Sequence, residues 1–314
     1  MSRPHVVSPA ELSSLRDLEL LARTTVEGLR QGLHRSPFHG YSAEFSQYRH
    51  YRPGDDLKYV DWKAFGRTDR LYSRQFRETT NMSALFVLDV SRSMDFPASS
   101  LTRGGLGSQG AGKSGVAASK FTLARAAAAV LATLVIDQGD AAGLLAINDE
   151  RSGTHYVPAR SGRHHLHICL AELARLQCDS TATVAVALQR AATLLRRRGM
   201  VVVISDMYED AAVMSEVRRL SRMGHDVVVI QVIAREELTL PRHGAVEFED
   251  LETGATLATN GAAVAVQYAR NIADFLVHVE QTVTRQGLDY LRLTTGESLE
   301  SALRRFLVGR RGGE

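Results

Sequence analysis

Hydrophobic and polar residues follow a repeating order over residues 83–310. Short apolar runs alternate with longer stretches in which apolar residues recur every three or four positions, as in helices that cover a sheet. The short runs predict strands at 84–89, 141–148, 153–158, 200–206, 226–233 and 289–293. The longer stretches predict helices at 119–138, 163–177, 183–198, 209–223, 264–286 and 298–309. This order predicts an α/β fold, a doubly wound and mostly parallel sheet with helices on both faces.

The remaining segments have different patterns. Residues 1–33 form an N-terminal helical unit, because helical periodicity runs through 9–33. Residues 34–82 are rich in Gly, Pro, Arg, Tyr and Asp, and they predict a compact, loop-rich element with short strands. Within 83–310, residues 97–119 form a Gly/Ser-rich insertion, and residues 246–257 predict a hairpin that begins a C-terminal hairpin and helix extension.

The composition is that of an ordinary globular protein and argues against several classes. Of the 314 residues, 44% are hydrophobic and 23% are charged, and the net charge is +3, too small to predict a nucleic-acid partner. No apolar run is long enough to predict a membrane span, and the polar N-terminus predicts no signal peptide. Cys169 and Cys178 are too few for a disulfide framework, so we expect a cytoplasmic protein.

One short run carries the clearest chemistry. An apolar strand leads directly into Asp89, Ser91 and Ser93, which place three oxygen-bearing side chains at alternate positions on the following loop. Mg²⁺ prefers small oxygen ligands and takes only one or two carboxylates from a protein. The carboxyl end of a strand is also where an open α/β sheet binds its ligands. We therefore predict a Mg²⁺ site here, with Mn²⁺ as an alternative ion.

A second strand supports the same site. Asp206 ends the most apolar strand of the chain, and a buried carboxylate is costly unless it is paired or bound to a cation. Thr181 and Thr183 lie on the loop before the predicted helix 183–198. Either threonine offers a hydroxyl ligand, and either is equally suited to be the helix N-cap. No catalytic residue is predicted.

Residues 107–114 match the phosphate-binding pattern G-x-x-x-x-G-K-[ST], which includes Lys113 and Ser114. A phosphate loop needs a buried strand before its glycines and a helix that begins at the Lys-Ser pair. Neither is predicted, because the surrounding residues resemble a Gly/Ser linker. A nucleotide-hydrolysing enzyme is therefore the weakest of the hypotheses.

The Asp89-x-Ser91-x-Ser93 run, followed by Asp206, resembles the metal-ion-dependent adhesion site of von Willebrand factor A domains. Further blocks are similar to the bacterial domain-of-unknown-function 58 family. These blocks are Gly40–Phe45, Arg52–Asp56, Val60–Lys63, Arg67-Thr68, Gly224–Val228, Phe248–Thr253 and Asp289–Leu291. The resemblance implies a von Willebrand factor A-like fold. It implies a threonine ligand near Ala182, so Thr183 is taken as the ligand and Thr181 as the alternative.

The resemblance also implies a function. Proteins of this family are commonly encoded beside MoxR-type AAA+ ATPases and are thought to act with them in assembling or maturing other complexes. We therefore expect a non-enzymatic, metal-dependent protein-binding module. Its partners would be a MoxR-type AAA+ ATPase and a client protein whose carboxylate completes the metal's coordination. The alternatives are a scaffold with a vestigial metal site and, less favoured, a phosphate-loop enzyme.

Overall fold

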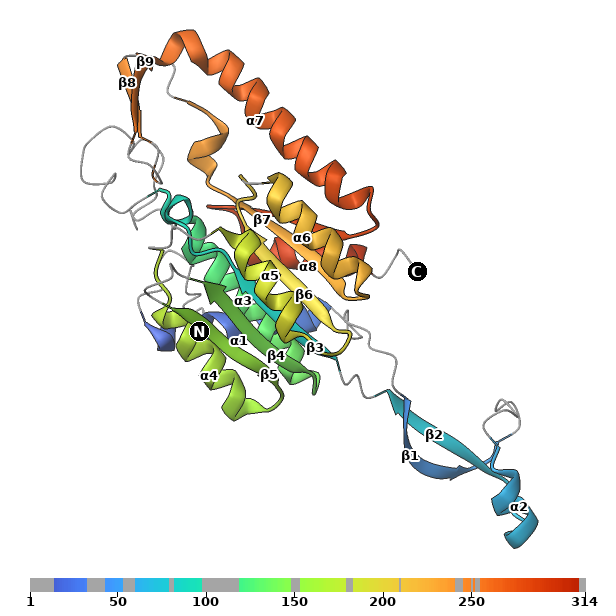
Figure 1. The fold of residues 1–314 in the computed structure, drawn as a ribbon. Helices are drawn as coiled ribbons and strands as arrows, with labels where there is room; N and C mark the ends of the chain where they lie inside the picture. Colours follow the sequence, from blue (N-terminus) through green and yellow to red (C-terminus); the bar gives the residue numbers. More distant parts are fainter. Residues whose placement is uncertain are drawn as a thin grey trace.

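The protein is a mixed α/β structure built on a six-stranded, mostly parallel sheet (Figure 1). The computed structural model describes residues 14–32, 43–52, 60–78, 82–97, 119–147, 153–178, 183–208, 210–240, 245–249, 251 and 255–310. The parallel strands are β3 (Ser83–Leu88), β4 (Ala141–Ile147), β6 (Met200–Ser205), β7 (Asp226–Ile233) and β10 (Asp289–Thr294). The edge strand β5 (Thr154–Arg160) runs antiparallel to β4, and the order is β10-β7-β6-β3-β4-β5. The predicted α/β class and mostly parallel sheet are confirmed.

The central strands are apolar at almost every position because both of their faces are covered. In β3, Phe86 and Leu88 pack into the hydrophobic cluster on one face, whereas Leu85 and Val87 pack into the cluster on the other. Successive side chains of a strand point to opposite faces, so a strand covered on both sides has no solvent-facing position. This burial explains why the apolar runs were recognisable in the sequence.

Helices cover the two faces in separate layers. One face carries α3 (Lys120–Asp137), α4 (Arg163–Arg175) and α8 (Leu299–Gly309), and the other carries α5 (Val184–Leu194), α6 (Asp210–Arg222) and α7 (Gly261–Thr284). The helix α1 (Leu15–Gly32) packs against α3, α4 and α8 rather than against the sheet. Helix α3 is therefore enclosed between the sheet and α1, which is why it is apolar on almost every side.

The predicted helices and strands of residues 83–310 are present, with small differences at their ends. The predicted helix 183–198 ends at Leu194, so Arg196–Arg198 follow the helix instead of forming its last turn. Gly224 follows α6 with a φ of +87°, the left-handed conformation in which glycine ends helices. The predicted hairpin is formed by β8 (Ala245–Glu249) and β9 (Thr256–Asn260).

The segment predicted as loop-rich contains more regular structure than its composition indicated. Strands β1 (Ala43–His50) and β2 (Tyr72–Glu78) pair antiparallel, and α2 (Trp62–Thr68) lies between them. Figure 1 shows these elements projecting from the sheet as a separate arm. We call residues 43–52 and 60–78 the hairpin arm. Helix α2 was not predicted, because its seven residues are too few to show a helical period.

Several parts of the sequence analysis fall on residues that the structure does not describe. Among them are Thr181, residues 98–118 of the insertion with the phosphate-loop residues Lys113 and Ser114, residues 1–13, and residues 34–42 and 53–59 of the loop-rich element. None of the helices in the described part of the chain combines the length and apolar character that crossing a bilayer requires.

Candidate metal centre

The candidate site lies where two neighbouring strands direct the chain to opposite faces of the sheet. After β3 the chain enters α3 on one face, and after β6 it enters α6 on the other face. Strands β3 and β6 are adjacent, so their carboxyl ends open between the two connections. Ligands of open α/β sheets bind in this kind of crevice. Asp89 follows β3 and Asp206 follows β6, and the backbone N–H of Asp89 donates to the carbonyl of Ile204 at 2.9 Å.

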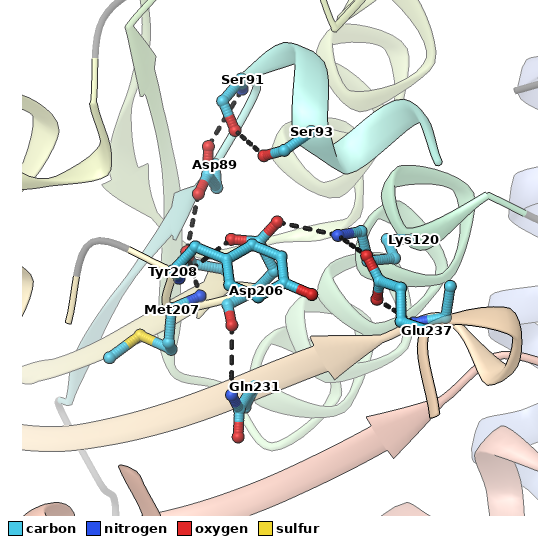
Figure 2. A network of polar contacts seen from close by, with 11 residues as sticks. Asp89, Ser91, Ser93, Lys120, Asp206, Met207, Tyr208, Gln231 and Glu237 are labelled. Atoms are coloured by element: carbon cyan, nitrogen blue, oxygen red, sulfur yellow. Dashed lines mark hydrogen bonds and ion pairs between the residues drawn. The ribbon is translucent and has the colours of Figure 1, made fainter. Parts of the chain in front are cut away.

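Asp89 is held by hydroxyl and amide donors. It is only 5% exposed. Its Oδ1 accepts from the backbone N–H of Ser91 at 3.0 Å, and its Oδ2 accepts from the hydroxyl of Ser205 at 2.6 Å. The hydroxyls of Ser91 and Ser93 lie 3.0 Å apart (Figure 2). The structure thus brings together the three residues of the predicted metal loop, and it adds Ser205, which the sequence analysis missed.

The charge of Asp89 has no cationic partner among the described residues. Burial, followed by the nearby carboxylate of Asp206, raises the pKa of Asp89 from 3.8 to about 6. Hydrogen bonds from Ser205 and Ser91 lower the pKa but do not outweigh burial. A buried carboxylate in this state is stabilised by any cation that reaches it.

Asp206, in contrast, is bound to a lysine. Lys120 is fully buried, and its Nζ lies 2.9 Å from Asp206 Oδ2 and 2.6 Å from Glu237 Oε1. Nζ also lies 4.8 Å from the centre of the Tyr208 ring. Burial lowers the pKa of Lys120, but the two carboxylates outweigh it and leave the pKa above its ordinary value. Lys120 therefore remains charged and supplies Asp206 with a cation from within the chain.

The lysine is positioned by elements that are distant in sequence. It is the first residue of α3, where the helix dipole disfavours a cation, so its two ion pairs must outweigh that cost. Glu237 comes from the 3₁₀ turn η5 (Arg235–Leu238), and its Oε2 accepts from the backbone N–H of Ala234 at 2.8 Å. Tyr268 of α7 donates to the carbonyl of Glu237 at 2.8 Å. Glu237 is thereby fixed in place from two sides.

A further layer of polar contacts connects Asp206 to the sheet. The carbonyl of Asp206 accepts from Gln231 Nε2 at 3.1 Å, and Gln231 Oε1 accepts from the hydroxyl of Tyr290 at 2.6 Å. Gln231 is fully buried on β7, so this series of hydrogen bonds reaches Asp206 through the core (Figure 2). The ring of Tyr208 stacks on Phe275 of α7 at 5.4 Å between centroids. Asp206 is therefore constrained through its backbone as well as through its side chain.

Thr183 lies at the N-cap position of α5, and its side chain makes no capping hydrogen bond. Helix α5 packs on β3 and β4, the side of the crevice nearer to Asp89. Among the described residues, no hydrogen bond joins Thr183 to Asp89, Ser91, Ser93 or Asp206. The hydroxyl of Thr183 therefore remains available as a ligand, although no hydrogen bond between described residues joins it to the metal loop.

The donors fit a hard divalent cation better than a softer metal. No group of three His, Cys, Asp or Glu side chains that could hold a metal occurs in the described part of the chain. A metal here would be held by one or two carboxylates and by hydroxyls, which is the donor set of Mg²⁺. The uncompensated buried charge of Asp89 is the observation that makes this set suitable for a cation.

The sequence analysis missed two charged residues of the site, Lys120 and Glu237. Lys120 had a detectable signal, because a single cation in the first turn of an apolar helix is unfavourable without a nearby acid. Glu237 had no such signal in the sequence. It lies four residues after β7, in an Arg-Glu-Glu run of the kind usually found at the surface. Its role depends on how close η5 approaches the start of α3, which only the fold reveals.

Comparison with known proteins gives a family and uncharacterized relatives. A family described as "Protein of unknown function DUF58" matches residues 47–275. Uncharacterized proteins of Mycobacterium bovis and Mycobacterium tuberculosis are 29% identical over 317 aligned positions, covering 100% of this chain and 94% of theirs. An uncharacterized protein of Mycobacterium avium is 31% identical over 161 positions, covering 50% of this chain and 95% of its own.

Two solved structures are also similar. The conserved hypothetical protein BatB from Bacteroides thetaiotaomicron has a TM-score of 0.41 and 13% identity, and it covers 74% of this chain and 100% of its own. An aerotolerance-related membrane protein from Bacteroides fragilis, carrying multiple mutations to serines, has a TM-score of 0.43 and 15% identity with the same coverage.

Proposed function

The chain belongs to the family described as Protein of unknown function DUF58, and from that premise we propose that it is a non-enzymatic, Mg²⁺-dependent protein-binding module. The observation that supports the proposal is Asp89. It is a buried carboxylate with a raised pKa, it lies at the switch point of the sheet, and two serine hydroxyls lie beside it. A von Willebrand factor A-like fold belongs to the same proposal, supported by the resemblance of the metal loop.

In this proposal the metal is held by the carboxylate of Asp89 and the hydroxyls of Ser91 and Ser93. Asp206 and Thr183 complete the ligand set, with Thr181 as the alternative threonine. The bound Mg²⁺, or Mn²⁺, supplies an open position that accepts a carboxylate from another protein. Ser205 orients Asp89 by donating to Oδ2, whereas Oδ1 faces the loop and accepts from the backbone N–H of Ser91. No residue of the chain is assigned a catalytic role.

The partners are proposed from the family resemblance. We infer that the chain acts beside a MoxR-type AAA+ ATPase in the cytoplasm, and that the carboxylate comes from a client protein under assembly or maturation. The thiols of Cys169 and Cys178 are not joined in a disulfide, which agrees with a reducing compartment. No nucleic acid and no membrane enter the proposal.

The first test is metal binding by isothermal calorimetry and thermal shift, with Mg²⁺ and Mn²⁺. We expect saturable binding to the wild type and a loss of at least about tenfold in affinity for Asp89→Asn, equivalent to about 1.4 kcal/mol. The matched control is Asp95→Asn, an exposed aspartate further along the same loop, in the turn η3 (Arg92–Asp95). If both variants lose affinity equally, the metal responds to loop charge and not to the Asp89 site.

The second test is metal-dependent capture of the ATPase. Purified MoxR-type ATPase, with a client protein, is passed over immobilised wild type, Asp89→Asn or Asp95→Asn in Mg²⁺ or in EDTA. We expect retention only where both Mg²⁺ and Asp89 are present. Equal retention by all three proteins in EDTA would refute the metal-dependent part of the proposal.

One observation favours a second candidate, a scaffold whose metal site is vestigial. Lys120 already neutralises the carboxylate of Asp206. Asp206 therefore does not need Mg²⁺ to balance its charge. On this alternative, calorimetry gives no heat with either metal, and Asp89→Asn leaves partner capture unchanged. The same two tests therefore separate the two candidates.

A further inference from the structure

The hairpin arm ends in an exposed aromatic pair. Trp62 and Phe65 are 59% and 36% exposed, although large apolar side chains are usually buried. Their rings lie 6.3 Å apart between centroids in an edge-to-face arrangement, and no residue of α2 is buried. Among the described elements, β1 and β2 pack chiefly against each other, and Figure 1 shows α2 at the far end of the arm from the sheet. The pair is thus presented away from the hydrophobic core.

The arm is built to hold this pair in position. Asp61 is the N-cap of α2, and its Oδ1 accepts from the backbone N–H groups of Lys63 and Ala64 at 3.0 Å each. Its Oδ2 accepts from the hydroxyl of Tyr48 at 2.8 Å, which ties α2 to β1. The backbone N–H of Asp61 also donates to the carbonyl of Tyr72 in β2 at 2.9 Å. The start of α2 is therefore fixed to both strands, and with it the backbone that carries Trp62.

Three cations lie on α2 or just after its end. Lys63, Arg67 and Arg70 are exposed, and none of the ion pairs between described residues includes them. Lys63 and Arg67 are four positions apart on α2, where like charges destabilise a helix. Apolar and cationic groups that are unfavourable in the isolated arm are favourable against an acidic, partly apolar surface.

We propose that the tip of the hairpin arm is a second docking surface, which binds an acidic protein segment through Trp62, Phe65, Lys63 and Arg67 without needing the metal. An apolar side chain of that segment covers the aromatic pair while its carboxylates meet the cations. This proposal goes beyond the metal-dependent function and does not depend on it.

The charges and size of the tip favour a protein segment over other acidic partners. Nucleic acid is bound by a continuous series of cations along its backbone, whereas the described residues 60–70 of this tip offer three cations and an exposed aspartate, Asp69. An interfacial membrane helix buries a long apolar face, whereas α2 has seven residues and two exposed aromatic side chains. Exposed tryptophan and arginine side chains are typical of protein-binding hot spots.

The chain contains a single tryptophan, so the fluorescence of Trp62 reports on this surface alone. The full chain is titrated in EDTA with a synthetic peptide of glutamates around one leucine. Matched peptides carry glutamine or lysine in place of glutamate. We expect a saturable blue shift with the acidic peptide only, and the same shift for Asp89→Asn. Failure of the metal tests would leave this result unchanged.

Two variants keep the reporter and change its surroundings. Lys63→Glu/Arg67→Glu and Phe65→Ala should each weaken binding of the acidic peptide by about tenfold or more. The control is Arg196→Glu/Arg197→Glu, which reverses two exposed cations outside the arm and should bind like the wild type. Circular dichroism checks that each variant is folded, and because all of these side chains are exposed, folding should be retained.

Several outcomes would overturn the proposal. No saturable shift up to millimolar acidic peptide would do so, as would equal binding of the glutamine peptide or no effect of the charge reversal. Tighter binding of oligothymidine or of anionic vesicles at the same salt concentration would assign the surface to nucleic acid or to a membrane. A blue shift that grows with protein concentration alone would assign it to a second copy of the chain.

Discussion

Asp89 and Asp206 follow neighbouring strands of one sheet, yet their charges are compensated in different ways. Asp206 lies 2.9 Å from the ammonium group of Lys120, which also pairs with Glu237. Asp89 has only hydroxyl and amide donors around its carboxylate, and its pKa is raised to about 6. The two carboxylates occupy equivalent positions in the fold. The charge of Asp206 is compensated by Lys120, whereas the charge of Asp89 is not compensated by a described residue.

This difference indicates which side of the crevice needs an external cation. An ion near both aspartates would compete with Lys120 for Asp206, but it would meet no internal competitor at Asp89. The serine hydroxyls are also on the Asp89 side. The proposed metal would therefore bind chiefly to Asp89 and the serines after β3, and Asp206 would contribute less.

The most severe test of the comparison is removal of the internal cation. Lys120→Met leaves Asp206 and Glu237 buried without a positive partner. Breaking a buried ion pair on one side costs about 3–5 kcal/mol of stability, so we expect a loss of that size in urea unfolding with EDTA present. Added Mg²⁺ should restore part of the loss, because it offers Asp206 a replacement cation.

A matched control removes a cation from an exposed pair. Arg23 and Glu27 form an ion pair of 3.2 Å with side chains that are 80% and 60% exposed. Arg23→Met should cost less than about 1 kcal/mol. If Lys120→Met costs no more than this control, Lys120 does not neutralise the β6 end, and the contrast between the two aspartates is wrong.

The second prediction concerns pH and the Asp89 end. The folded protein holds the proton of Asp89 up to about pH 6, whereas the unfolded chain releases it near the ordinary value of 3.8. Stability from this group is therefore full below the unfolded pKa and is lost as the pH rises through the folded pKa. The difference between 3.8 and about 6 corresponds to about 3 kcal/mol.

Asp89→Asn isolates this effect, because the variant has no proton to lose. In EDTA, the unfolding free energy of the wild type should fall by more than about 2 kcal/mol beyond that of the variant between about pH 4 and about pH 7, and the full difference of about 3 kcal/mol is reached over about pH 3 to about pH 8. Saturating Mg²⁺ should abolish the difference at the higher pH, since it compensates the ionised carboxylate. Parallel pH curves for the two proteins would mean that the charge of Asp89 is already compensated.

The sequence predicted the sheet better than it predicted the charges around its site. Strands such as β3 and β6 are apolar at five of their six positions because both faces are buried, and that pattern is local. Asp89 and Asp206 were predictable for the same reason, as the residues that end those strands. The pairing of Lys120 with Glu237 joins residues 117 positions apart, so no local pattern could indicate it. The regular structure of the hairpin arm was underestimated because α2 is held by a contact between distant residues. The hydroxyl of Tyr48 in β1 donates to Asp61, the N-cap of α2.

The smallest expected effect is at Thr183, and it decides whether the Asp89 end has a further ligand. Thr183 is an N-cap without a side-chain hydrogen bond, so Thr183→Ala should change stability by less than about 0.5 kcal/mol. Ser298, the N-cap of α8, accepts from the backbone N–H of Ser301 at 3.3 Å, and Ser298→Ala should cost about 1 kcal/mol.

Measurements of Mg²⁺ affinity should distinguish the two variants. If Thr183 is a ligand on the Asp89 side, Thr183→Ala lowers Mg²⁺ affinity in calorimetry by several-fold while Ser298→Ala leaves it unchanged. Unchanged affinity in Thr183→Ala would restrict the protein ligands on that side to Asp89, Ser91 and Ser93. The contrast with Asp206 would then rest on the metal loop alone, because α5 packs against β3 and β4 without contributing to the ion.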